Sequence, residues 1–99
     1  MILHITAVEY LDDYKLAVTF DNGRSGVADL ADALGQGVFL PLKDIEQFRQ
    51  VRVDGELKTI VWPNGADLAP EYVYFQAFKD DPKLLPQFEA WGYTGESAA

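Results

Sequence analysis

The fold is decided by residues 14–24, Tyr-Lys-Leu-Ala-Val-Thr-Phe-Asp-Asn-Gly-Arg. Leu16, Val18 and Phe20 alternate with smaller or polar residues, which is the period-two pattern of a β-strand with one buried face. Asn22-Gly23 follows directly, and this pair favours a tight hairpin because both residues tolerate the positive φ of a type I′ turn. We therefore predict a hairpin whose second strand covers about residues 25–30.

The segment before this hairpin predicts a further strand. Residues 2–10 are rich in β-branched and aromatic side chains, and Asp12-Asp13 interrupts the run. The first thirty residues therefore predict a three-stranded antiparallel meander.

A second hairpin is expected in the middle of the chain. Residues 50–54 alternate, Asp54-Gly55 is a turn signal, and residues 58–62 are β-branched and aromatic. Pro63-Asn64-Gly65 should end the second of these strands and lead into a helix.

The helices are expected to be short. Pro41 can open one, because the first turn of a helix does not use the N–H that proline lacks, and Leu42, Ile45 and Phe48 give it an apolar face. Pro70 with Glu71 has the same opening pattern.

A last helix is expected after Asp80-Asp81-Pro82, with Asp81 as its cap, Ala90 near its end and Gly92 beyond it. The sequence as a whole predicts an α+β fold, with a mostly antiparallel sheet of about five strands in two hairpin units and two or three short helices. Residues 1–91 are expected to form a single domain, and residues 92–99 a frayed tail.

Composition limits the function classes. Among 99 residues there is no cysteine, so disulfides and thiolate chemistry are excluded. The first residues have neither a basic region nor a long apolar run, and no stretch has the length and apolarity of a membrane span. We therefore expect a cytoplasmic protein that makes no membrane contact.

Charge indicates the kind of partner. Sixteen acidic and eight basic residues give a net charge of −8, which opposes binding to nucleic-acid phosphates and would favour a basic protein. High negative charge also serves solubility alone. We expect another protein as the partner and no direct contact with nucleic acid, and a second copy of the chain is a further candidate.

No catalytic set of side chains is visible in the sequence. His4 is the single histidine, and Ser25 and Ser97 are the serines, neither of them in a nucleophile motif. The carboxylate pairs lie at turn signals and lack the spacing of an EF-hand, so no metal ion or cofactor is expected.

The best candidate binding stretch is Trp62-Pro-Asn-Gly-Ala-Asp-Leu68 with Glu71. In one interpretation Trp62 and Leu68 are buried, and Asp67 bonds backbone N–H groups. In the other, Trp62, Asn64, Asp67 and Glu71 form a patch that binds a peptide or small ligand, since tryptophan is enriched at interaction hot spots.

A second candidate surface is the apolar stripe of the last helix. Leu84, Leu85, Phe88 and Trp91 recur at helical spacing. Such a stripe either covers the core of its own domain or binds another protein or a second copy.

A resemblance adds to this pattern. Its most specific part is the string at residues 62–68, which lies between Val51-Arg-Val-Asp54 and Pro70-Glu71 with Tyr74. The strands Ile5-Thr-Ala-Val8 and Leu16-Ala-Val-Thr-Phe20, and the helix ending at Phe48, have the matching order. Over roughly residues 3–78 the chain resembles the small bacterial family known as domain of unknown function 2442.

This resemblance implies an α+β fold with antiparallel strands, and it brings no known activity or catalytic residues. Some relatives carry a helix-turn-helix domain, and some are encoded beside another small protein, which implies gene regulation or an antitoxin-like pair. This chain has Ala69 where relatives often have serine, and its segment after about residue 80 is too short for a helix-turn-helix domain. The DNA-binding role is therefore not implied for it.

Three hypotheses follow. The first is a non-enzymatic protein-interaction or regulatory module, either antitoxin-like or the accessory partner of a protein encoded nearby. The second is a small-molecule or metal-dependent enzyme that uses Asp67 and Glu71. The third is an accessory domain of a transcription regulator that lacks its DNA reader.

Overall fold

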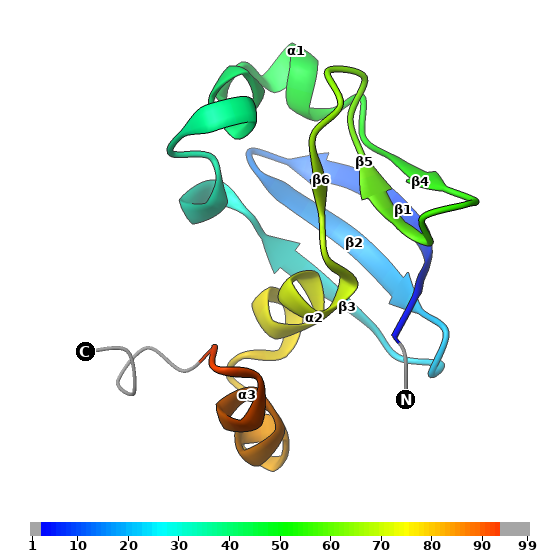
Figure 1. Ribbon diagram of the computed structural model, residues 1–99, viewed down its shortest axis with the longest axis vertical. Coiled ribbons are helices and arrows are strands. Elements are labelled where there is room, and N and C mark those ends of the chain that lie inside the picture. Colours follow the sequence, from blue (N-terminus) through cyan, green and yellow to red (C-terminus); the bar gives the residue numbers. More distant parts are fainter. Residues whose placement is uncertain (1–2, 94–99) are drawn as a thin grey trace.

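The computed structural model describes residues 3–93, which form two three-stranded antiparallel sheets and several short helices (Figure 1). The first sheet has the order β1-β2-β3, with β1 at Ile5–Asp12, β2 at Lys15–Phe20 and β3 at Ser25–Asp29. Leu16, Val18 and Phe20 are buried in the core, as the alternating pattern predicts. The α+β class and the N-terminal meander are confirmed.

The turn between β2 and β3 differs from the expected type I′. Gly23 has a φ of +87°, whereas Asn22 keeps a negative φ. The Gly23 N–H donates to the Phe20 carbonyl at 3.0 Å, and the Phe20 N–H donates to the Arg24 carbonyl at 2.9 Å. The Asn22 side chain accepts from the Arg24 N–H at 3.0 Å, so asparagine acts here through its carboxamide and only the glycine uses the left-handed region.

The second sheet is also three-stranded and antiparallel, and one of its turns resembles the β2–β3 turn. Its order is β4-β5-β6, with β4 at Arg52–Asp54, β5 at Thr59–Val61 and β6 at Asp67–Leu68. The turn Trp62-Pro-Asn-Gly-Ala66 has the same hydrogen bonds, at 3.0 Å from the Gly65 N–H to the Trp62 carbonyl and 2.9 Å from the Trp62 N–H to the Ala66 carbonyl. The sequence predicts that β5 leads directly into a helix. It does not predict β6, because a strand of two residues is too short to show a hydrophobic period.

The two sheets meet where β1 begins. The Ile5 N–H donates to the Lys58 carbonyl at 2.9 Å, which ties the first strand to the loop between β4 and β5. Lys58 closes that loop with a φ of +61°, a region where a side chain is strained. The Asp54 carboxylate accepts from the Glu56 and Leu57 N–H groups, both at 2.8 Å, and holds the loop from within.

Replacing Lys58 with glycine is expected to raise the free energy of unfolding by about 1 kcal/mol, because glycine adopts positive φ without a Cβ clash. Denaturant unfolding followed by circular dichroism measures the change. Lys58→Ala is the matched control, since it removes the same side chain but keeps the Cβ. Equal stabilisation by both variants would contradict the backbone explanation.

The segment between the sheets differs from the expected single helix at Pro41. It forms two 3-10 helices, Ala31–Ala33 and Gly37–Lys43, and then the α-helix α1 at Ile45–Phe48. Asp44 caps α1 by accepting from the Glu46 N–H at 3.0 Å, so Pro41 lies inside a 3-10 helix instead of opening α1. Leu42 and Phe48 are nevertheless buried.

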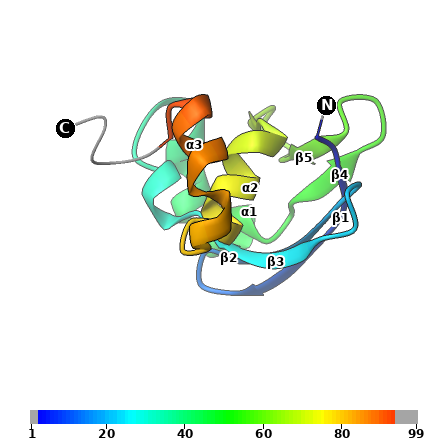
Figure 2. The ribbon, with the colours of Figure 1, turned by 90° about the horizontal axis from the view of Figure 1, so that it is seen from below.

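The C-terminal helices follow the second sheet, and the first of them packs against β3. They are α2 at Pro70–Phe78, the 3-10 helix Pro82–Leu84 and α3 at Leu85–Trp91, and the helices lie on one side of β1–β3 (Figure 2). Asp81 accepts from the Lys83 N–H at 3.0 Å, and Gly92 ends α3 with a φ of +81°. The predicted stop at Gly92 is therefore confirmed, whereas Asp81 caps the 3-10 helix and α3 itself begins without a side-chain cap.

The start of α2 lacks a side-chain cap, as the sequence indicates for Ala69. Ala69→Ser is expected to raise the free energy of unfolding by about 1 kcal/mol, because a serine hydroxyl can accept from a free N–H of the first turn. Thermal or denaturant unfolding checks the value, with Ala69→Val as the control that adds no acceptor. No gain over that control would show that the first turn does not need a cap.

The described structure continues a little past the end of α3. The Tyr93 N–H donates to the Phe88 carbonyl at 3.0 Å, and its ring stacks on Phe75 with centroids 5.4 Å apart. Of the tail expected at residues 92–99, Gly92 is hydrogen-bonded at the end of α3 and Tyr93 is packed, and residues 94–99 lie outside the described residues.

Candidate functional site

Trp62, the central residue of the candidate stretch, lies in the core. Its side chain is 2% exposed, and its indole N–H donates to the Phe48 carbonyl at 2.9 Å. The Phe48 ring lies 5.8 Å from the Trp62 ring. Trp62 therefore joins β5 to α1, as the structural interpretation of this stretch predicts.

Asn64 also makes contacts within the chain. Its carboxamide N–H donates to the Val38 carbonyl at 2.9 Å, and its oxygen accepts from the Ala66 N–H at 3.1 Å. The side chain thus holds the β5–β6 turn and links it to the 3-10 helix at Gly37–Lys43.

The two acids of the stretch lie on different elements. Asp67 is exposed in β6, and Glu71 is partly exposed in the first turn of α2. None of Asp67, Glu71 and the buried Trp62 ring lines the pocket at Tyr74 that is described below. A binding role for this stretch stays a prediction, and the groups available for it are the exposed ones.

The apolar stripe of the last helix is mostly turned inward. Phe88 is buried, Leu84 and Trp91 are partly buried, and Leu85 is 43% exposed. The Phe88 ring packs edge-on against Phe75 at 5.1 Å. Covering the core accounts for most of this stripe, and its role as a surface for another protein stays a prediction.

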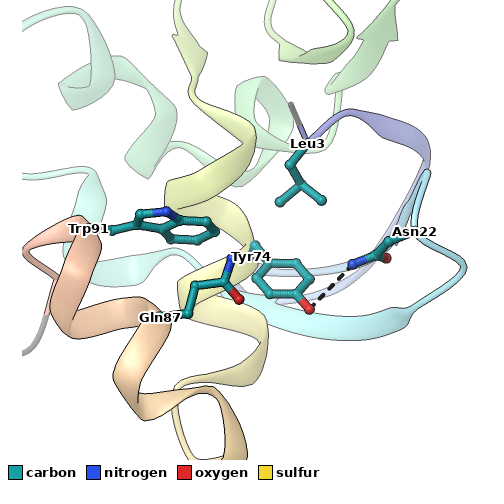
Figure 3. Close-up of a pocket in the computed structure, with 5 residues that line it drawn as sticks. All are labelled: Leu3, Asn22, Tyr74, Gln87 and Trp91. Atoms are coloured by element: carbon teal, nitrogen blue, oxygen red, sulfur yellow. Dashed lines mark hydrogen bonds between the residues drawn. The ribbon is translucent and has the colours of Figure 1, made fainter. Parts of the chain in front are cut away.

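A pocket of about 210 Å³ lies where the N-terminal segment, the β2–β3 turn, α2 and α3 meet (Figure 3). Its lining residues come from these four segments and are Leu3, Asn22, Tyr74, Gln87 and Trp91. The sequence indicates Trp91 as part of an interaction surface but does not assign Asn22 or Gln87 to a site. No local pattern could have found the pocket, because its residues lie far apart in the chain.

Tyr74 is the central side chain of the pocket. It is 4% exposed, and its hydroxyl oxygen accepts from the Asn22 carboxamide at 3.4 Å (Figure 3). The same oxygen accepts from the Arg24 guanidinium at 3.5 Å. Arg24 also donates to the Asp81 carboxylate at 3.2 Å and lies 4.7 Å above the Phe78 ring. Arg24 thus connects the β2–β3 turn to the end of α2.

This contact network shifts the pKa values of its ionised groups. Hydrogen bonds to Tyr74, and then to Asp81, raise the pKa of Arg24 above its ordinary value. The Lys83 backbone N–H, with Arg24 as a further cause, lowers the pKa of Asp81. Nearby, burial and then the Glu71 carboxylate raise the pKa of Tyr93.

The remaining arginines also pair with carboxylates of the same chain. Arg49 lies 3.5 Å from Glu46, and Arg52 lies 3.8 Å from Asp54. The pKa of Asp54 is lowered mainly by the backbone N–H groups of the loop, and Arg52 adds a smaller effect. The positive charges of Arg49 and Arg52 are therefore partly neutralised by acids.

His4 lies just before β1 and pairs with the β2–β3 turn. Its Nδ1 is 3.2 Å from the Asp21 carboxylate, and its backbone N–H also donates to that side chain at 3.2 Å. Among residues 3–93, no group of three or more histidine and acidic side chains is arranged to hold a metal ion. No helix in the same range is long and apolar enough to cross a membrane.

The sequence of this chain matches the model of a known protein family. The model of the family described as protein of unknown function DUF2442 matches residues 5–79, most of the chain. The chain belongs to the DUF2442 family. The matched region ends just after α2, so the 3-10 helix at Pro82–Leu84 and α3 lie outside it.

One solved structure shares the fold of this DUF2442 chain. It is the crystal structure of NE0471 from Nitrosomonas europaea, a protein described as a candidate DNA-binding protein, with a TM-score of 0.70 and 26% sequence identity. The match covers 81% of this chain and 52% of that protein, so the shared part is about half of NE0471. A search of curated proteins finds no significant match.

Proposed function

We propose that this chain is a non-enzymatic protein-interaction module that acts within a regulatory assembly. The observation that supports this proposal best is that an acidic chain pairs its arginines with its own carboxylates. The chain carries a net charge of −8, and each of Arg24, Arg49 and Arg52 is paired with a carboxylate of the chain itself.

These pairs matter because arginine is the side chain best suited to phosphate groups. A DNA-binding surface gains affinity when free lysine and arginine displace counterions from phosphates, and an acidic surface opposes this. The same surface attracts a basic protein and speeds its association. The charge distribution therefore favours a protein partner over direct contact with DNA.

The comparison with NE0471 supports a regulatory setting. That protein is described as a candidate DNA-binding protein, and this chain matches about half of it. If DNA contact in such proteins belongs to the other half, the shared DUF2442 part acts beside it. This observation also favours a second candidate, an accessory domain of a transcription regulator without the DNA reader.

Co-production with the protein encoded by the adjacent gene tests the first candidate. We expect both chains in one size-exclusion peak at low salt, and partial dissociation at high salt because screening weakens charge attraction. The chain alone serves as the control, and its mass also tests the predicted homodimer. Separate elution of the two proteins at every salt concentration would contradict the proposal.

Mobility-shift assays separate the two candidates. The chain alone is expected to leave duplex DNA unshifted at low salt, where charge attraction is strongest. A DNA-bound partner whose complex moves more slowly after the chain is added would favour the accessory-domain candidate. A shift by the chain alone would contradict both candidates, because it would make the chain the DNA reader.

A further inference from the structure

We propose that the pocket at Tyr74 binds one apolar side chain of an extended peptide from the partner protein, and that its rim hydrogen-bonds the neighbouring peptide groups. This inference rests on the proposed protein-interaction function and names the site through which that function acts. It concerns the five residues that line the pocket, Leu3, Asn22, Tyr74, Gln87 and Trp91.

The size of the pocket favours a single side chain. Its volume of about 210 Å³ is below the roughly 300–1,000 Å³ of sites that enclose whole drug-sized ligands or cofactors. Tyr74 and Trp91 present aromatic rings to it and Leu3 an aliphatic side chain (Figure 3). Such walls gain free energy by covering the apolar surface of a residue such as leucine.

The polar groups of the pocket suit a peptide backbone. The Gln87 side chain carries one hydrogen-bond acceptor and one donor group, as a peptide unit does. The Asn22 carboxamide already bonds the Tyr74 hydroxyl and the Arg24 N–H, and it keeps one further amide hydrogen to donate. The Tyr74 hydroxyl oxygen accepts two hydrogen bonds, and within residues 3–93 its own hydrogen is given to no protein acceptor. A backbone carbonyl of the peptide would accept that hydrogen, since a buried donor without an acceptor is costly.

The charge around the pocket separates a peptide from a nucleic acid. In the described part of the chain, no aspartate, glutamate, lysine, arginine or histidine lines the pocket, and the nearby Arg24 is already paired with Asp81. The net charge of −8 favours basic residues beside the inserted side chain. The expected sequence is therefore an apolar residue flanked by lysine or arginine.

Nuclear magnetic resonance on the full chain tests this site. The probe is the capped tripeptide Lys-Leu-Lys at millimolar concentration, and the matched ligand Lys-Gly-Lys has the same charge without the apolar side chain. We expect the leucine peptide, and not the glycine peptide, to shift the side-chain N–H signals of Asn22, Gln87 and Trp91. Single-stranded oligothymidylate is the third ligand.

Variants connect these signals to the pocket. Gln87 is exposed, so Gln87→Ala should keep the fold and weaken peptide binding at least several-fold. Gln47→Ala changes the same residue type on α1, away from the pocket, and should bind like the unaltered chain. Trp91→Ala should abolish the difference between the two peptides, provided its amide spectrum remains that of a folded protein.

Three results would overturn the inference. They are no shift of the three side-chain signals at millimolar peptide, equal shifts with both peptides, or shifts with oligothymidylate alone. The partner protein distinguishes this failure from failure of the proposed function. If it binds the Gln87→Ala and unaltered chains equally well, the pocket assignment fails while the interaction function stands.

Discussion

Trp62→Ala is expected to lower the free energy of unfolding by about 4 kcal/mol, because it leaves a large cavity in the core. The ring is 2% exposed and lies against Phe48. A small domain has only about 5–15 kcal/mol of stability in total, so this variant should lose a large part of it. Denaturant unfolding followed by circular dichroism measures the loss.

Trp62→Phe is the matched variant for the polar contact. It keeps an aromatic ring but removes the indole N–H that donates to the Phe48 carbonyl at 2.9 Å. We expect a loss of about 1 kcal/mol from this change, since the Val51 N–H still donates to the same carbonyl. If Trp62→Ala costs less than Trp62→Phe, the ring does not support the core, and the ligand-binding interpretation of Trp62 gains support.

Gly26→Val is expected to lower the free energy of unfolding by about 2–3 kcal/mol, because β3 and α2 pack too closely for a side chain. A Cβ at this position would lie 2.9 Å from the Phe78 ring and 3.4 Å from the Ala77 Cβ. The Phe78 ring would have to move, and with it the contact that Arg24 makes above that ring. Denaturant unfolding gives the change in stability.

Gly35→Val is the control for this substitution. A Cβ at Gly35 would meet no atom within 4 Å, so the same change there should alter stability by well under 1 kcal/mol. Comparable losses in the two variants would show that the contact with α2 does not determine the effect at Gly26.

Local patterns were enough to predict most of the strands and the boundaries of the last helical segment. The alternation of Leu16, Val18 and Phe20 specified β2 and its buried face. Asp81 and Gly92 marked the boundaries of the last helical segment, because capping depends on neighbours in the chain. The resemblance carried by residues 62–68 indicated the DUF2442 family, which the family model confirms.

The same local signals were weaker where several conformations suit one sequence. Asn22-Gly23 is compatible with more than one tight turn, and the structure uses positive φ at the glycine alone. β6 has only two residues, and it forms because the preceding turn aligns Asp67 and Leu68 with β5. Neither outcome follows from hydrophobic period, since both depend on how the paired strands meet.

The sequence by itself determined the fold class, most of the strands, the acidic charge and the family, because these depend on composition and on residues close together in the chain. Only the tertiary structure decided that Trp62 packs inward and that Asn22, Tyr74 and Trp91 share a pocket. The physical reason is that burial and convergence depend on which distant segments pack together. That packing is set by the joint fit of many side chains, and no single stretch of the chain records it.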